Sequence, residues 1–245
     1  MNSQLLTKKE FFHLIETHIS NNGYHLTTVM SNSQLPRFSY TIGLTNMFGY
    51  ELIFAGGILY LKDDLMSIFD FIIKTLKSDN TVSKFEIEKI GSFTLHSVDT
   101  SWSELTLLGA YDFYKTNKIQ TFQIIPNKKH YTFDIHDMSK EFNANSEPVW
   151  HYLVDNWDFH VPEYSTVTTN LKALFGEKIT EVMRWEEDVW EMFVGNPSDE
   201  PEENMRVVSL ETIIGIDQSL LCSLDLDVGA GIWRDAAKLK WNKWK

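Results

Sequence analysis

The chain has 245 residues, of which 43% are hydrophobic, enough to bury one large core or two modest ones. Its 34 acidic residues exceed its 22 basic ones, and the net charge of -12 repels phosphate backbones, which argues against nucleic-acid binding. The apolar runs fall short of the roughly 20 residues of a membrane span, and no signal-peptide pattern opens the chain, so we expect a cytoplasmic protein. Cys222 is the single cysteine, so we expect no internal disulfide.

Apolar periodicity in the first half predicts helices mixed with strands. A helix is expected behind the cap residue Thr7, and the Asn-Asn-Gly sequence at 21–23 ends it. Apolar residues recur every three or four positions over 60–80, which is typical of an amphipathic helix. The remaining predictions are strands over 24–30, 38–44 and 50–57, paired strands over 84–99, a helix over 101–117, and a hairpin over 119–133 with its turn at Pro126–Lys129.

A looser stretch over 143–163 separates two halves, because Pro148 and Pro162 interrupt any long regular element there. We therefore predict an α+β fold of two small mixed domains, each a mostly antiparallel sheet with packed helices. The first domain is predicted over 1–142, the connector over 143–163 and an acidic second domain over 164–245. Within the second, we expect a short helix over 165–176, two strands over 179–195, a loop over 196–204, and a strand and a helix over 205–226.

Histidines are the first candidates for chemistry, because a metal ion needs ligands whose spacing brings them together. His130, Asp134 and His136 would share one face of a strand, where they could hold iron or zinc. The alternative is a hairpin edge whose polar residues face water, and we favour it. We therefore predict no metal site and no cofactor.

The stretch from Phe38 to Gly57 places polar residues within apolar strands, a pattern that favours a ligand pocket. The carboxylate of Glu51 adjoins a buried strand and needs a partner or a ligand; the alternative is that it caps the strand or pairs with a lysine. Neither a serine in a glycine elbow nor a phosphate-binding loop is present, so we expect no catalytic activity. The pocket would be lined by Tyr40, Thr41, Gly43, Glu51 and Trp102.

The negative charge is concentrated in the second half. From Glu177 to Asp227 there are 14 acidic residues against three basic ones, which gives -11. Strand alternation over 185–193 places tryptophans beside carboxylates, a mixture that tight interfaces use; the alternative is a solvated edge that deters aggregation. The predicted docking residues for a basic protein partner are Trp185, Glu186, Glu187, Asp188, Trp190, Asp199, Glu200, Glu202 and Glu203.

Two neighbouring strand motifs point to a family. Phe38, Tyr40, Thr41, Gly43 and Leu44 are followed by Glu51, Leu52 and two closing glycines. This pattern resembles the bacterial domain-of-unknown-function 4262 family, and the resemblance continues through Trp102 to cover residues 11–137. Members often carry His-Pro before the Glu-Leu pair, where this chain has Gly49 and Tyr50. The family implies no established reaction.

The second half resembles another bacterial module over residues 165–235, through segments such as WEMFVG and LDLDVGAGIWRD. They are similar to immunity-protein 33-like modules, also grouped with domain-of-unknown-function 2185, and this resemblance implies protection against a toxin by direct binding. We therefore predict a non-catalytic immunity or antitoxin protein whose partner is a basic toxin. The alternative is a small-molecule-binding protein or an enzyme with a pocket around Tyr40, Thr41, Glu51 and Trp102.

Overall fold

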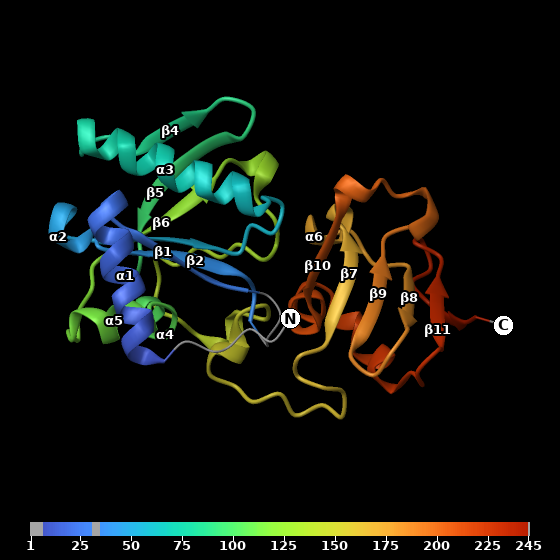
Figure 1. The fold of residues 1–245 in the computed structure, drawn as a ribbon. Helices are drawn as coiled ribbons and strands as arrows, with labels where there is room; N and C mark the ends of the chain where they lie inside the picture. The colour runs from blue at the N-terminus through green and yellow to red at the C-terminus, as the bar shows by residue number, and fades with distance from the viewer. Residues whose placement is uncertain (1–6, 31–34, 245) are drawn as a thin grey trace.

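A computed structural model of the protein describes residues 7–30 and 35–244. These residues form two six-stranded sheets that lie side by side, each packed with helices (Figure 1). Each sheet contains one parallel pair of strands, and its other neighbours are antiparallel. The predicted α+β fold with two mostly antiparallel sheets is therefore confirmed. The predicted division at 142 and 163 stays a prediction, and the start of its first domain, residues 1–6, lies outside the described residues.

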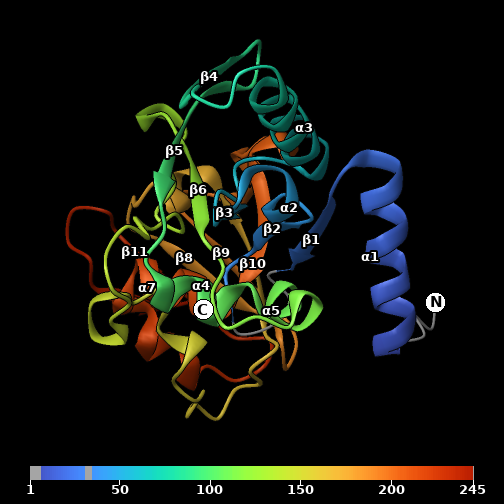
Figure 2. The ribbon, with the colours of Figure 1, turned by 90° about the vertical axis from the view of Figure 1, so that its left-hand side faces the viewer.

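The first sheet has the strand order β1-β2-β3-β6-β5-β4, with β3 and β6 parallel. Its strands are β1 (His25–Val29), β2 (Phe38–Ile42), β3 (Glu51–Ala55), β4 (Lys84–Ile87), β5 (Gly91–Ser97) and β6 (Thr121–Pro126). Its helices are α1 (Lys8–Asn22), α2 (Thr45–Phe48), α3 (Lys62–Ser78), α4 (Thr100–Thr106) and α5 (Leu108–Tyr114). In the view of Figure 2, α1 stands beside the edge strand β1.

Both faces of the first sheet are covered. On β3, the side chains of Leu52 and Phe54 pack with α3, whereas Ile53 and Ala55 pack with α1, α4 and α5. Burial on both faces explains why this strand is a continuous apolar run without alternation.

The predicted first helix is also confirmed, because Thr7 and Glu10 form a capping box at its start.

The second sheet has the order β10-β7-β9-β8-β11-β12, with β7 and β9 parallel. Its strands are β7 (Thr166–Asn170), β8 (Glu181–Arg184), β9 (Val189–Phe193), β10 (Met205–Ser209), β11 (Gly231–Arg234) and β12 (Trp241–Lys243). Its helices are α6 (Leu171–Leu174), α7 (Leu210–Ile216) and the 3-10 turns η4 (Pro197–Asp199), η5 (Glu202–Asn204) and η6 (Gln218–Asp225). Among the described residues, no helix has both the length and the apolar character needed to cross a membrane.

Three predicted elements differ from the structure. The hairpin over 119–133 is wrong: β6 is followed by the 3-10 turn η1 (Lys128–His130), and the chain then leaves the sheet. The backbone N–H of Phe133 donates to the carbonyl of Leu174, and the carboxylate of Asp134 accepts from the N–H of Ile58. Because these two residues bind other segments, they do not form a strand that pairs with β6. The helix over 101–117 is broken at Leu107 into α4 and α5. The helix over 165–176 begins with strand β7, and only α6 is helical.

The segment predicted as a connector, 143–163, packs against both halves. It contains the 3-10 turns η2 (Ala144–Ser146) and η3 (His151–Leu153). Val149 and Trp150 are buried with residues of the first sheet, and Val161 is buried in the core of the second. This segment therefore ties the two sheets together by burial of apolar side chains.

A short loop after β3, residues 56–60, also joins the two sheets, and we call it the bridging loop. The side chain of Ile58 is buried in the core of the second sheet. Arg206 on β10 donates to the carbonyls of Ile58 at 3.0 Å and Leu59 at 2.8 Å. Arg37 of the first half donates to the carbonyls of Gly57 at 2.7 Å and Tyr60 at 2.8 Å. Two guanidinium groups thus satisfy four carbonyls of one loop.

We predict that Gly56→Ala destabilises the protein by at least about 3 kcal/mol, because φ is +73° and a Cβ there would overlap the carbonyl oxygen of Asp134. Gly49→Ala is the matched control, since Gly49 has φ +83° but no atom of the described part of the chain lies within 4 Å of the position that an added Cβ would occupy. It should cost roughly 1–2 kcal/mol from backbone strain alone. Urea unfolding followed by circular dichroism measures both, and equal losses would show that the bridging loop tolerates the contact.

Candidate functional site

The carboxylate of Glu51 is the most densely hydrogen-bonded group of the predicted pocket. It is fully buried and accepts from the Thr41 hydroxyl at 2.6 Å, the Thr45 N–H and hydroxyl at 2.8 Å each, and the Tyr114 hydroxyl. The N–H groups of Gly43 and Leu44 add longer bonds of 3.2 and 3.3 Å. Burial raises the pKa of Glu51, and the bonds from Thr41, Tyr114 and Thr45 act in the opposite direction. Its partners come from the protein, so this carboxylate holds the turn into α2.

The other predicted pocket residues are buried as well. The Tyr40 hydroxyl, on a residue 3% exposed, accepts from Gly109 N–H at 3.1 Å. The indole of Trp102 is fully buried and donates to the carbonyl of Lys140 at 3.0 Å. Thr41 and Gly43 both bind Glu51. These five residues therefore act as packing and hydrogen-bonding elements, and the interpretation of an open pocket around them is not supported by their burial.

None of the three candidate metal ligands lies on a strand: His130 ends the 3-10 turn η1, and Asp134 and His136 follow on irregular backbone. His130 packs against the ring of Tyr60, with ring centroids 5.9 Å apart. Asp134 is buried and accepts from Ile58 N–H at 3.0 Å, and His136 lies 2.6 Å from Glu147. The expectation that the three share one face of a strand is wrong. In residues 7–30 and 35–244, no three His, Cys, Asp or Glu side chains are grouped to hold a metal ion.

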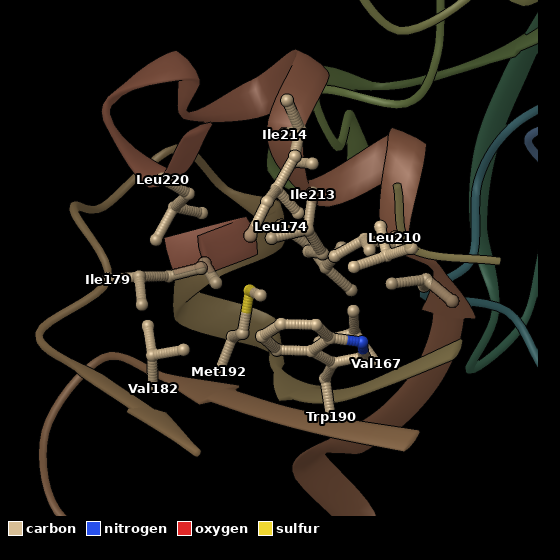
Figure 3. Close-up of a cluster of buried hydrophobic side chains, with 14 of the residues drawn as sticks. Val167, Leu174, Ile179, Val182, Trp190, Met192, Leu210, Ile213, Ile214 and Leu220 are labelled. Atoms are coloured by element: carbon tan, nitrogen blue, oxygen red, sulfur yellow. The ribbon is translucent and has the colours of Figure 1, made fainter. Parts of the chain in front are cut away.

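The predicted docking residues divide between surface and core. Trp185 is 50% exposed in the turn between β8 and β9, followed by the acidic residues 186–188. Because this segment is a turn, the alternation predicted for 185–188 is wrong. Trp190 is 0% exposed: it and Met192 face α6 and α7, beneath Leu174 and Leu210 (Figure 3). The guanidinium of Arg184 also lies 4.9 Å from the centroid of the Trp190 ring. Because Trp190 is fully buried, it is not available to contact a partner protein.

The acidic residues after β9 also differ in availability. Asp199, Glu202 and Glu203 are exposed. Glu200 instead accepts hydrogen bonds from Lys172 at 3.0 Å and from Asn170 at 2.9 Å, so it anchors its loop to β7 and α6. Three of these four carboxylates therefore face solvent.

A groove of about 660 Å³ lies on the second sheet, on the face away from the buried core. Alternate residues of β8 and β9 build its floor, including Met183 and Phe193, while Trp190 and Met192 on β9 enter the core. Trp185 and the 52% exposed Trp244 also line it. Four carboxylates border the groove, at Glu181, Glu191, Asp225 and Asp227, together with one ammonium group, that of Lys243.

The sequence pattern does not predict most of the groove residues, because they come from separate parts of the chain. Trp244 reaches the floor because its backbone N–H donates to the carbonyl of Gly231 at 3.1 Å, next to Met183. Asp225 and Asp227 lie at the end of η6 and just beyond it. The alternation of Glu181, Met183, Glu191 and Phe193 was a usable signal for β8 and β9. No local pattern connects Trp244 to them.

Glu211 on α7 is a buried carboxyl that only weak hydrogen bonds, from Ser209 and from its own backbone, support. It is 0% exposed, and within residues 7–30 and 35–244 neither side-chain oxygen makes a hydrogen bond of good geometry. Burial raises its pKa to about 7, and the carboxylate of Glu163 acts in the same direction. Near neutral pH this buried position on α7 therefore favours the protonated carboxyl more than an exposed glutamate does.

Comparison with known proteins gives one family match. Residues 18–136 match the model of a family described as Domain of unknown function (DUF4262). The match confirms the resemblance of the first half. It includes β2, β3 and the residues that donate hydrogen bonds to Glu51, among them Thr41, Thr45 and Tyr114. No curated protein and no solved structure matches the chain. The resemblance of residues 165–235 to immunity proteins stays a prediction.

We predict that Glu51→Gln destabilises the protein by about 2–4 kcal/mol, because an amide NH2 cannot accept from the donors that surround this position. Glu16→Gln, at an exposed position on α1, is the control and should change stability by no more than about 0.5 kcal/mol. Chemical denaturation measures both. A small, equal effect would contradict the role of Glu51 as the anchor of this turn.

Glu211 should make the protein less stable as pH rises. The pKa of Glu211 is higher in the folded state, so the folded protein keeps a proton that the unfolded chain releases above about pH 4.5. Stability should fall by about 3 kcal/mol between pH 4.5 and 7.5 through this group. Glu211→Gln should remove that part of the slope and stabilise the protein at pH 8. Thermal midpoints across this pH range test it, and parallel curves for the two proteins would refute it.

Proposed function

We propose that the protein is a non-catalytic binding protein that docks a basic segment of a partner protein in the groove of the second sheet. The observation that carries the proposal is the combination of Trp185 and Trp244 with a border of carboxylates in one groove. The rings of exposed tryptophans bind apolar side chains, and their faces attract the cationic groups of arginine and lysine. Carboxylates close to them select a cationic partner.

The charge distribution supports the same partner. The segment from Glu177 to Asp227 carries -11 of the net charge, and it contains β8, β9 and the loops beside the groove. Asp199, Glu202 and Glu203 are exposed within it. A surface of one sign speeds the approach of an oppositely charged protein, whereas contacts in the groove slow its departure. We therefore assign steering to the acidic loops and retention to the groove.

A basic toxin is the partner that we propose, and the protein would then be an immunity or antitoxin protein. This step rests on the resemblance of residues 165–235 and on the acidic groove. Occlusion of a toxin needs a complementary surface and no chemistry on the part of the antitoxin. Co-expression with the product of each flanking gene tests it. Neutralisation of a toxic neighbour is expected, and the proposal of an immunity function fails when no toxic neighbour is neutralised.

The kinetics of binding to the toxin that co-expression identifies test whether the groove is the docking surface. Asp225→Lys with Asp227→Lys and, as the matched control, Glu202→Lys with Glu203→Lys each change the net charge by the same amount. Asp225 and Asp227 line the groove, and Glu202 and Glu203 do not. Both pairs should slow association, and the groove pair alone should speed dissociation about tenfold or more. Equal dissociation rates in the two variants would place the docking surface elsewhere.

A further inference from the structure

A second cavity, of about 350 Å³, lies where the segment after η1 meets the 143–163 segment. It shares no lining residue with the groove of the second sheet. Phe133 is 58% exposed, so the cavity opens to solvent. Aromatic and aliphatic side chains line it, among them Tyr131, Phe133, Ile135, Val149 and Trp150, together with the imidazole of His136.

The imidazole of His136 is held from two directions, and its backbone is fixed as well. Its Nδ1 lies 2.6 Å from Oε2 of Glu147, whose side chain is 10% exposed. The ring stacks on Trp102, with centroids 5.2 Å apart and planes inclined by 26°. Gln123 donates to the backbone carbonyl of His136 at 2.6 Å. His136 lines the cavity, its side chain is 32% exposed, and within the described residues only Nδ1 is engaged, so Nε2 has no partner in the protein.

The protonation of the pair decides what Nε2 can bind. Burial lowers the pKa of His136, so the imidazole is neutral at pH 7, and the charges of Asp137 and Lys140 nearby act in opposite directions. Burial raises the pKa of Glu147 to about 7. Above that pH the ionised carboxylate accepts from Nδ1–H, which leaves a lone pair on Nε2. His136 is then an acceptor whose orientation is fixed by a carboxylate.

We propose that this cavity binds a small aromatic molecule that donates a hydrogen bond from a hydroxyl or N–H group to Nε2 of His136. The volume lies near the lower end of the roughly 300–1,000 Å³ range of ligand pockets, which suits one or two rings. The aromatic and aliphatic lining contributes burial, and the single fixed acceptor contributes selectivity. This site is independent of the docking groove proposed above.

A matched pair of probes tests the hydrogen bond separately from the apolar contacts. p-Cresol and toluene have nearly the same shape, and only p-cresol has a hydroxyl group. At pH 8, ligand-observed NMR titration of the full chain should show that p-cresol binds about tenfold more tightly than toluene. In His136→Phe, which keeps a ring against Trp102, the two probes should bind equally. Glu147→Gln keeps an oxygen acceptor for Nδ1–H and should retain most of the preference for p-cresol.

The wild-type protein supplies a second readout that does not depend on whether a variant folds. Addition of p-cresol should shift the 15N resonance of His136 Nε2, with Nδ1 remaining the protonated nitrogen. Toluene should leave the Nε2 resonance nearly unchanged. The proposal is overturned if neither probe binds at millimolar concentration, if both bind the wild-type protein equally, or if p-cresol binds without moving the Nε2 resonance.

Discussion

The bridging loop of residues 56–60 carries the constraint on which the arrangement of the two sheets depends. Peptide groups buried between two packed halves lose water, so each needs a partner within the protein. Arg37 and Arg206 satisfy its carbonyls from opposite sides, and Asp134 accepts the N–H of Ile58. Because the side chain of Ile58 enters the second core, the loop that leaves β3 of the first sheet also contacts the second.

Asp134 connects the bridging loop to the cavity that His136 lines. The carboxylate holds the segment after η1 against the bridging loop, two residues before His136. The indole of Trp150 donates to the carbonyl of Asp134 at 3.0 Å, which brings the 143–163 segment to the same place. The walls of the cavity are therefore fixed by hydrogen bonds to irregular backbone, where packing of regular elements does not determine position.

Buried carboxyls serve two distinct purposes in this molecule. Glu51 and Asp134 accept hydrogen bonds from backbone N–H groups, and each organises a turn that would otherwise contain unpaired donors. Glu211 has only weak hydrogen bonds, and its raised pKa follows from burial. Burial raises the pKa of all three carboxyls, so ionisation disfavours the fold at each of them, and the hydrogen bonds to Glu51 and Asp134 reduce that cost. The distinction depends on local donors, because all three are fully or nearly fully buried.

The sequence by itself determined the α+β class, the capped first helix, the apolar strand β3 and the pairing of β8 with β9, because periodicity and caps are local properties of the chain. It did not determine which face of β9 is covered. Trp185 and Trp190 look equivalent in the sequence, yet one lies in an exposed turn and the other under two helices. Alternation says which residues share a face, and only tertiary packing says which face meets the core. The groove and the His136–Glu147 pair likewise required the tertiary structure, since their residues converge from distant segments.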